Sequence, residues 1–472
     1  MTTDGTVPVV TTPRRSWLAL GVAAASIFLF VFDSGLLSVS LPAVEHDFPG
    51  TSRATLSWLA TGYLVALASF LLVAGRVADR RGRKRIYLAG LSLFSVGAIM
   101  TSLAPTIGLV IAARVVEGIG GAFMTASSLA LVLPDFPPEK QQTAIGIWGG
   151  IGSLGSVLAP TVGAIAVQDV SWRLGFALVG ALGLASLALG ARVLHEPVAR
   201  IEPVAIHVLN VVFGSVGLGM LALVLSQGRR WGWHSVGTLV TAASSALLIT
   251  AFVYRAKREV SPLLDFGLFQ FPQWTSNTLA AGIQQIGFFS WFLTTPLILV
   301  NVWGWSVVAS GSAMALGLAV SAISGPLGGR WADRSGTTIP IVISAIVAAA
   351  GPGWLALTAR PHPAFWTAFL PATLLMGGGG GICGMLTTGG ALQRMPPTTL
   401  GSANSTHQLF RRICGMAGVA VALALLGDHV GPSLLSSARV VWTMVSVAHL
   451  VMCVPLLVEW WRSSRRASLN PE

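Results

Sequence analysis

Charged residues are scarce in this 472-residue chain, where they make up 10% of the sequence, and only three cysteines occur. The cysteines, Cys383, Cys414 and Cys453, all fall within apolar runs and lack the paired spacing of a disulfide framework or a metal site. None of the few lysines follows a glycine, so the G-K-[ST] core of a phosphate-binding loop cannot form. We therefore expect no metal, no cofactor and no use of ATP.

Catalytic motifs are missing as well. The sequence contains no H-E-x-x-H, and the histidines that stand beside carboxylates, such as His46 and His195, lie at loops or span boundaries, which argues against an enzyme. The formal net charge of +12 raises the question of nucleic acid as a partner. However, the basic residues lie between apolar runs and form no single stripe, so we expect no nucleic-acid binding.

Apolar residues dominate what is present. They make up 53% of the chain, and the mean hydropathy is +0.74, well above that of a soluble domain. An apolar helix of about 20 residues crosses the hydrocarbon of a lipid bilayer. The sequence therefore predicts an all-α integral membrane protein with fourteen spans, near residues 17–40, 54–74, 86–104, 107–132, 142–166, 173–191, 206–226, 236–254, 277–300, 307–328, 338–358, 365–388, 400–427 and 438–460.

The densest charge cluster, Gly75 to Arg85, separates two of these spans. Its charges must lie at a water interface, and its arginines assign it to the cytoplasmic side by the positive-inside rule. A second, weaker copy runs from Gly329 to Gly336, and both copies contain G-R-x-A-D-R-x-G. An internal repeat of this kind predicts two homologous membrane halves, as in many secondary transporters.

The first copy resembles the loop signature G-x-[LV]-A-D-[RK]-x-G-R-[KR] of the major facilitator superfamily and matches every specified position. The resemblance implies the major facilitator fold and a switch in which Asp79 docks on a helix end of the other half in one conformation and leaves it in the next. An acid that merely tempers a basic loop is the alternative, and the recurrence at Asp333 favours the switch. The residues assigned to the switch loop are Gly75, Asp79, Arg80, Gly82, Arg83, Asp333 and Arg334.

The separation of the two loop copies leaves room for two extra spans between the halves. The resulting 6+2+6 arrangement resembles that of the fourteen-span, QacA-like drug/proton antiporters, and we expect a monomer. The expected domains are a cytoplasmic tail (1–16), an N-terminal six-helix bundle (17–195), a linker with two extra spans (196–260), a C-terminal six-helix bundle (261–460) and a second cytoplasmic tail (461–472).

Three ionisable residues lie inside spans of the first half. Asp33 in the first span is a functional candidate because a charge in lipid is costly. Arg114 and Glu117, three residues apart, share a face of the fourth span. Asp33 and Arg114 lie at matched depth when counted at about 1.5 Å per helical residue. We predict that these three residues couple proton movement to transport, with Arg114 keeping Asp33 ionised while it is near; a purely structural ion pair is the alternative.

Small residues at a spacing of three to four form a stripe along the predicted fifth span. Such stripes permit close helix contact. The same stretch resembles the antiporter signature G-P-x-x-G-G of the superfamily, with two glycines replaced by alanine, and this resemblance supports export. Helix packing alone is the alternative. The residues assigned to this helix are Gly152, Gly155, Pro160 and Gly163.

Candidate cargo-binding residues come from both halves. A polar and aromatic stripe on the ninth predicted span, at i, i+4 and i+7, suits an amphipathic solute, and core packing explains it equally well. Near the start of the thirteenth span a histidine lies one turn before an arginine, which either snorkels to the cytoplasmic surface or contacts an anion or the substrate. The predicted cavity residues are Phe30, Gln284, Phe288, Trp291, His407 and Arg411.

These features predict a proton-driven exporter of small molecules that works by alternating access in the cell (inner) membrane, with both termini cytoplasmic. The acidic residues of the first half favour lipophilic, drug-like cations as cargo. Export of a lipid, an antibiotic or a metabolite by the same mechanism is the runner-up. A non-transporting membrane sensor with the same fold is a further alternative.

Overall fold

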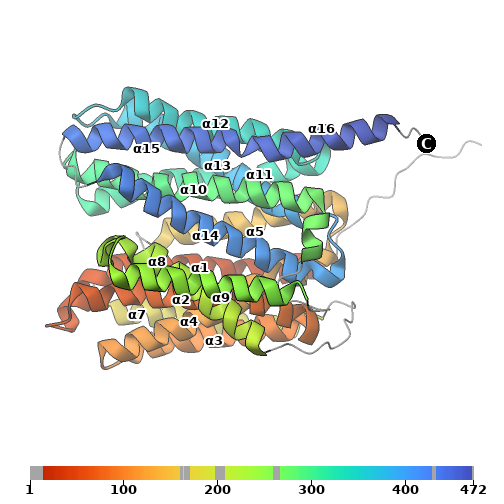
Figure 1. Ribbon diagram of the computed structural model, residues 1–472, viewed down its shortest axis with the longest axis horizontal. Helices are drawn as coiled ribbons and strands as arrows, with labels where there is room; N and C mark the ends of the chain where they lie inside the picture. The colour runs from red at the N-terminus through yellow and green to blue at the C-terminus, as the bar shows by residue number, and fades with distance from the viewer. Residues whose placement is uncertain are drawn as a thin grey trace, which may run out of the picture.

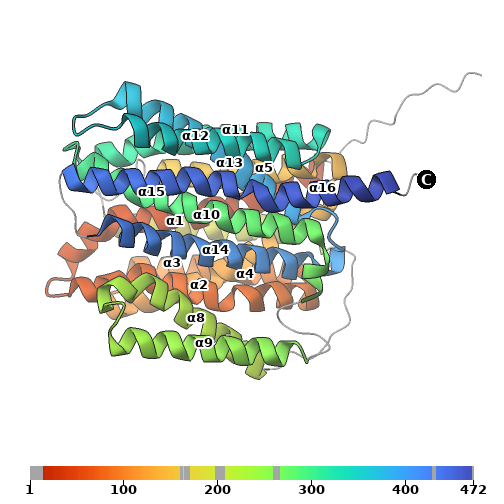
Figure 2. The same ribbon diagram turned by 45° about the horizontal axis from the view of Figure 1, so that its top comes forward.

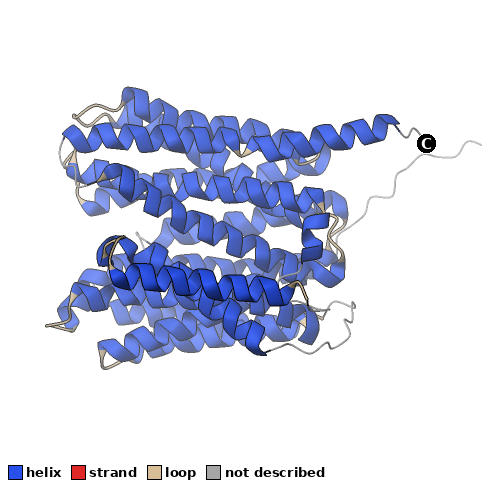
Figure 3. Cartoon of the chain, viewed as in Figure 1, coloured by secondary structure: helices blue, strands red, loops and turns tan. Residues whose placement is uncertain are grey.

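The chain is almost entirely helical. The computed structural model describes residues 14–159, 163, 171–196, 208–258, 266–427 and 432–469, and this part contains helices, turns and loops but no strand (Figure 3). The α-helices are α1 (Arg14–Asp47), α2 (Arg53–Arg81), α3 (Arg83–Leu103), α4 (Ile107–Val132), α5 (Pro138–Leu158), α7 (Trp172–Val193), α8 (Val208–Trp231), α9 (Val236–Ala256), α10 (Pro272–Asn301), α11 (Val307–Ser335), α12 (Thr338–Thr358), α13 (Leu370–Leu392), α14 (Leu400–Leu426), α15 (Pro432–Val451) and α16 (Cys453–Leu469).

The number of membrane spans differs from the expected fourteen. Within the described residues, twelve helices are long and apolar enough to cross a membrane. The expected span at 206–226 corresponds to the apolar segment Leu209–Leu225, which at about 1.5 Å per residue is shorter than the ~30 Å of hydrocarbon. The expected span at 142–166 coincides in part with α5, where two glutamines and many glycines dilute the apolar residues. The prediction of fourteen spans in a 6+2+6 arrangement is therefore wrong.

The axes of the long helices are roughly aligned, and the helices pack side by side (Figures 1 and 2). Within the first half α4 packs on α2 and α3, and within the second half α13 packs on α11 and α12. The two halves meet along two seams, where α2 contacts α14 and α5 contacts α11. α8 and α9 form a hairpin, and α8 contacts α2 and α14. Helices from both halves therefore surround the centre of the molecule.

Polar caps and glycine turns determine where several helices begin and end. Ser52, Thr106 and Ser306 each accept a hydrogen bond from the backbone N–H three residues further on. Gly82 is the single residue between α2 and α3 and has a φ of 103°, a conformation that disfavours residues with a Cβ. Gly336, its counterpart in the repeat, ends α11 with a φ of 78°. Both copies of the charged loop are therefore tight turns.

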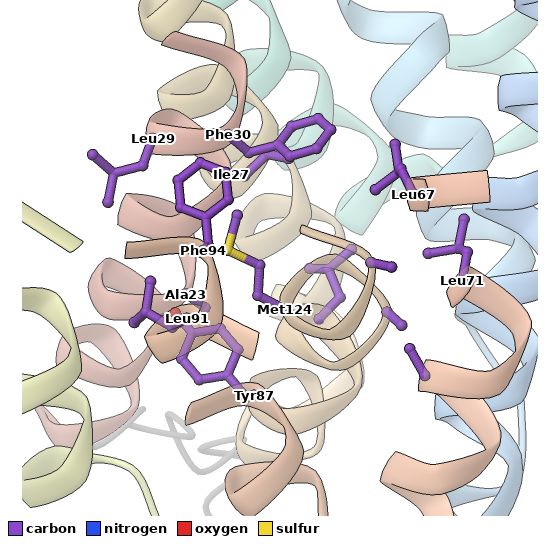
Figure 4. Packing of buried hydrophobic residues seen from close by; sticks show 14 of the residues in the cluster. Ala23, Ile27, Leu29, Phe30, Leu67, Leu71, Tyr87, Leu91, Phe94 and Met124 are labelled. Carbon is purple, nitrogen blue, oxygen red and sulfur yellow. The ribbon is translucent and has the colours of Figure 1, made fainter. Parts of the chain in front are cut away.

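Side chains of α1, α3 and α4 form much of the core of the first half. Figure 4 labels Ile27, Phe94 and Met124, one from each of these helices, among the buried side chains of this core. Phe94 and Met124 are fully buried, and the van der Waals packing of such side chains stabilises the contact between helices in a membrane, where lipid removes the hydrophobic driving force. This packing holds α1, which carries Asp33, against α4, which carries Arg114.

Glycines let α3 and α4 approach each other closely. A Cβ at Gly120 would lie 2.3 Å from the backbone nitrogen of Phe94, and a Cβ at Gly90 would lie 2.6 Å from that of Met124. These backbone atoms cannot move away as the end of a flexible side chain can, so neither Gly90 nor Gly120 can be replaced by a larger residue without moving the helices apart. Gly108, in the first turn of α4, has no such neighbour within 4 Å.

We expect Gly120→Ala to destabilise the protein, because the added methyl group overlaps the backbone of α3. Overpacking of this kind costs about 1–3 kcal/mol, so the thermal unfolding midpoint of the purified protein in detergent should fall by about 1–3 °C, given the unfolding entropy of a chain of this length. Gly108→Ala is the matched control, since it adds the same group to the same helix in open space. Gly108→Ala should leave the midpoint unchanged or raise it slightly, because alanine is the better helix former. Equal shifts in the two variants would contradict the close contact of α3 with α4.

Candidate functional site

One end of the bundle, which carries the Gly82 and Gly336 turns and is called the closed end below, holds the two halves together. There the Asp79 carboxylate on α2 accepts hydrogen bonds from the backbone N–H groups of Gly401 at 2.9 Å and Ser402 at 2.7 Å. These amides belong to the first turn of α14, where the partial positive charge of a helix start favours an anion. Asp79 therefore fastens the first half to the second.

Arg83 reinforces this contact. Its guanidinium donates to Asp79 from Nε at 3.1 Å and from Nη2 at 2.8 Å, and it also donates to the carbonyls of Ala130 and Pro397. The pair is buried, with side-chain exposures of 5% for Arg83 and 2% for Asp79. Pro397 begins the short turn that leads into α14, so Arg83 joins the same two halves as Asp79.

The glycines of the predicted switch loop make room for close approaches. A Cβ at Gly75 would lie 2.0 Å from the Ser405 hydroxyl on α14, and a Cβ at Gly82 would lie 2.7 Å from the Glu196 carboxylate. Larger residues at Gly75 would therefore push α2 away from α14. Arg80 lies in the last turn of α2.

The second copy of the loop makes the equivalent contact with the halves exchanged. Asp333 on α11 accepts hydrogen bonds from the backbone N–H groups of Gln142 and Thr143, both at 2.9 Å, and from the Thr143 hydroxyl. Both partners lie near the start of α5. Arg334 follows in the last turn of α11 and is exposed. We call the contacts of Asp79 and Asp333 the two locks of the closed end.

A cavity of about 1660 Å³ lies between the halves and reaches the helix ends opposite the locks. At this open end its lining includes Pro42 near the end of α1, Ser57 near the start of α2 and Val307 at the start of α11. Pockets for drug-sized ligands typically measure about 300–1,000 Å³. The cavity is therefore large enough for such a molecule, and it opens at the end that has no lock.

The predicted cargo residues that line this cavity are Phe30, Gln284, Phe288 and Arg411. The structure differs at the other two, Trp291 and His407, which are buried away from the lining. Trp291 belongs to the hydrophobic core of the second half. His407 lies between the hydroxyls of Thr278, 3.0 Å from Nδ1, and Thr388, 3.2 Å from Nε2. Helical periodicity predicts the face on which each residue lies. The contacts of Trp291 depend on the bulk of its indole ring, and those of His407 depend on the two hydroxyls.

The three charges predicted inside the first half lie together. Arg114 Nη1 donates to Asp33 Oδ1 at 2.9 Å and Oδ2 at 2.8 Å, and it also donates to Glu117 Oε2. The Thr101 hydroxyl donates to Glu117 Oε1 at 2.9 Å. All three charged side chains are at most 1% exposed. Two carboxyl groups thus share one guanidinium in a space closed to water.

Two aromatic rings connect this cluster to the cavity wall. The Arg114 guanidinium lies 4.5 Å from the centroid of the Tyr63 ring, and Tyr63 packs against Phe30 with 5.9 Å between ring centroids. Phe30 lines the cavity, whereas the three charged residues do not. From the second half, the Arg412 guanidinium lies 4.9 Å from the centroid of the Phe30 ring.

The small residues that resemble an antiporter signature lie where α5 packs on α1. A Cβ at Gly155 would lie 2.7 Å from the carbonyl oxygen of Phe28, and Gly163 also lies next to α1. Gly152 lines the cavity. Pro160 lies outside the described residues. These glycines bring the two helices close together, and their part in export stays a prediction.

Several contacts of the site were not predicted from the sequence. The backbone amides of Gly401 and Ser402 carry no side-chain signal, so only the structure reveals them as partners. Thr101 is one of many hydroxyl residues in the spans. By contrast, Tyr63 is one of only three tyrosines in the chain, and Arg412 is an arginine inside a predicted span. Both features marked these residues in the sequence as candidates for the site.

The sequence matches a known protein family and resembles bacterial resistance and export proteins. The family model described as Major Facilitator Superfamily matches residues 23–419. The chain is 28% identical over 419 residues to the tetracenomycin C resistance and export protein of Streptomyces glaucescens, covering 88% of this chain and 77% of that protein. It is 30% identical over 454 residues to the multidrug resistance protein Stp of Mycobacterium tuberculosis, covering 94% and 79%.

A solved structure shares the fold. The crystal structure of the human organic anion transporter MFSD10 (TETRAN) superposes with a TM-score of 0.67, covering 94% of this chain and 100% of that chain. The sequence identity is 14%, so this likeness concerns the fold alone.

We expect Asp333→Asn to loosen the closed end, because an amide lacks the charge that favours the α5 amides. A hydrogen bond to a charged group contributes about 1.5–3 kcal/mol, so the population open at this end should grow about tenfold or more. Electron paramagnetic resonance can measure the distance between spin labels at Glu139 and Ser335, which are both exposed, in a variant without the native cysteines. Asp47→Asn, which removes an exposed carboxylate at the open end, is the control. An unaltered distance distribution in Asp333→Asn would show that this residue does not hold the end closed.

Proposed function

The chain belongs to the major facilitator superfamily, a family of membrane transporters and not of enzymes, and we propose that it exports lipophilic, drug-like compounds in exchange for protons. The names of the Streptomyces glaucescens and Mycobacterium tuberculosis relatives, which refer to resistance or export, support this direction of transport. The central cavity supports a small molecule of drug size as the cargo.

The sealed cluster of Asp33, Arg114 and Glu117 is the observation that carries the proton coupling. Two carboxylates and one guanidinium together hold a net charge of −1, which is costly among apolar helices. One bound proton makes the cluster neutral. Release of that proton requires water or another cation to reach the carboxyl groups, and this happens when the helices move. A site whose charge balance depends on a single proton suits a proton-coupled transporter.

The two locks support alternating access. Both are formed while the cavity is open at the opposite end. Breaking both frees the α2–α14 and α5–α11 seams, so the halves can tilt, open the closed end and shut the other. The moving bodies in this proposal are the bundles of residues 17–195 and 261–460, with 196–260 between them. One chain supplies both halves of the pathway, so we propose that the protein works as a monomer.

We assign the closed end to the cytoplasm. Most of the 29 lysines and arginines lie in loops on the side of Gly75 to Arg85, and positive charge marks cytoplasmic loops. In this orientation both termini are cytoplasmic, the protein lies in the cell (inner) membrane, and the cavity faces the outside, where cargo leaves and protons enter.

Phe30 and Tyr63 supply a route for coupling. Tyr63 contacts both Arg114 and Phe30, and Phe30 lines the cavity. Cargo that displaces Phe30 therefore acts on Tyr63 and through it on Arg114. In the reverse direction, protonation of a carboxyl group changes the partners of Arg114 and so the position of Tyr63.

We expect Asp33→Asn to abolish proton-coupled export and to leave a folded protein in the membrane. The amide has almost the same shape but cannot carry a negative charge, so the cluster no longer needs a proton. In proteoliposomes, the proton release that lipophilic dyes trigger should fall to the level of protein-free vesicles. Cationic, neutral and anionic dyes are tested side by side, so that the result does not depend on the charge of the cargo.

Asp47→Asn serves as the control, because it removes an exposed carboxylate near the end of α1 whose partners, Trp172 and Arg173, do not belong to the cluster. Its transport rate should equal that of the wild type, and the thermal unfolding of both variants verifies folding. The assignment fails when Asp33→Asn transports at the full rate with an unchanged pH dependence. The proposed mechanism fails when the wild type exchanges no protons under any imposed pH difference.

A further inference from the structure

The wall of the central cavity carries positive charge and no negative charge. Among its lining residues in the described part of the chain, the charged ones are Arg230, Arg411 and Arg412, and no aspartate or glutamate is present. Arg230 lies at the open end, where it donates to the Ser57 hydroxyl at 2.7 Å. The other two lie deep in the bundle on α14. The expectation of cationic cargo rested on acids of the first half, and those acids do not reach the cavity.

Neutral groups hold Arg411 in position. Its Nη1 donates to the Thr388 hydroxyl at 3.0 Å, and the same hydroxyl contacts His407 Nε2 at 3.2 Å. The other ring nitrogen of His407 lies 3.0 Å from the Thr278 hydroxyl. Nε of Arg411 is buried and has no hydrogen-bond partner. The guanidinium is therefore oriented by a fixed network and retains an unused donor.

Arg412 also lacks a negative partner. Its guanidinium lies over the Phe30 ring, a contact that stabilises a cation but does not neutralise it. Among the ion pairs of the described residues, none includes Arg411 or Arg412. Two neighbouring cations inside a bundle repel each other and are costly to keep away from water. An anion bound beside them offsets both costs.

We propose that the cavity selects amphipathic cargo with an anionic group, such as a carboxylate, a sulfonate or a phenolate on an apolar body, and that Arg411 and Arg412 bind this group. Guanidinium groups match planar oxyanions with paired donors. Phe288 and Phe289 line the same cavity and offer apolar surface to the body of the cargo. This inference rests on the proposed exporter function, since it specifies the charge of the exported compound.

Tetraphenylborate and tetraphenylphosphonium provide a direct test, because they share size and shape and differ in the sign of their charge. Equilibrium dialysis measures the binding of each ion to the full-length protein in detergent, with protein-free micelles as the blank. We expect the wild type to bind the borate more tightly. Tetraphenylborate has no hydrogen-bond acceptor, so it reports the attraction between charges alone. Arg412→Gln and Arg411→Gln should each weaken borate binding about tenfold through the loss of this attraction and leave phosphonium binding unchanged or stronger.

Two further variants separate charge from folding. Arg412→Lys keeps the positive charge and should retain the preference for the borate. Arg360→Gln removes an exposed cation outside the cavity and should bind both ions as the wild type does. Tighter binding of the phosphonium by the wild type, or an equal loss of both ions in Arg412→Gln, overturns the proposal.

The source of the anion is tested by competition against bound tetraphenylborate. Displacement by anilinonaphthalenesulfonate supports a soluble organic acid, displacement by phosphatidylglycerol supports a lipid headgroup, and displacement by neither overturns the proposal. These binding measurements require neither protons nor transport. Anion-selective binding without proton exchange refutes the exporter mechanism alone, whereas proton-coupled transport without a preference for the borate refutes this inference alone.

Discussion

The cost of an unpaired charge among apolar helices governs how this molecule is arranged. A charged side chain at the centre of a span costs about 2.5–3.5 kcal/mol on insertion scales, so each one needs compensation. Arg114 is compensated by two carboxyl groups, and Asp79 and Asp333 by amides at the start of helices. Arg411 and Arg412 have no negative partner, since Arg411 contacts the Thr388 hydroxyl and Arg412 the Phe30 ring. The proposed proton site is the cluster around Arg114, and the proposed switch is the pair of locks. The proposed cargo site is the pair of arginines, where an anionic group of the cargo supplies the compensation.

The parts of the site that depend on few neighbours could be predicted from the sequence. A spacing of three places Arg114 and Glu117 on one helix face, matched depth brings Asp33 level with Arg114, and the repeated loop relates Asp79 to Asp333. Membership of the superfamily, indicated by that loop, is confirmed. Each of these inferences needs only helix geometry or a local pattern.

Features that depend on the surroundings could not be predicted. The stripe on α10 left two roles open for Trp291, cargo binding and core packing, and only the structure, in which neighbouring helices cover this side chain, places it in the core. The span number was wrong where apolar stretches are short, as in α8, or diluted by glutamine and glycine, as in α5. A cationic cargo was inferred from Asp33 and Glu117. These acids lie behind the cavity wall, which the Phe30 ring forms, and this arrangement is not visible in the sequence.

The two locks are unequal, and the difference follows from the repeat itself. Arg83 stands four residues after Asp79 and adds hydrogen bonds to it and to the carbonyl of Pro397 across the seam. The residue four after Asp333 is Thr337, which cannot supply these contacts. Asp333 is also less buried than Asp79.

The Asp333 lock therefore has fewer charged partners than the Asp79 lock, but α5 and α11 pack together more extensively than α2 and α14 do. Both seams are connected to the proton site. α5 packs on α1, the helix of Asp33, through the close approach of Gly155 to the backbone of Phe28. α2 touches the cluster directly, because Arg114 donates to the Leu59 carbonyl and lies over the Tyr63 ring. The closed end is thus held in two ways, by buried polar contacts at the α2–α14 seam and by close helix packing at the α5–α11 seam, and a change in the partners of Arg114 reaches the α2–α14 seam without an intervening helix.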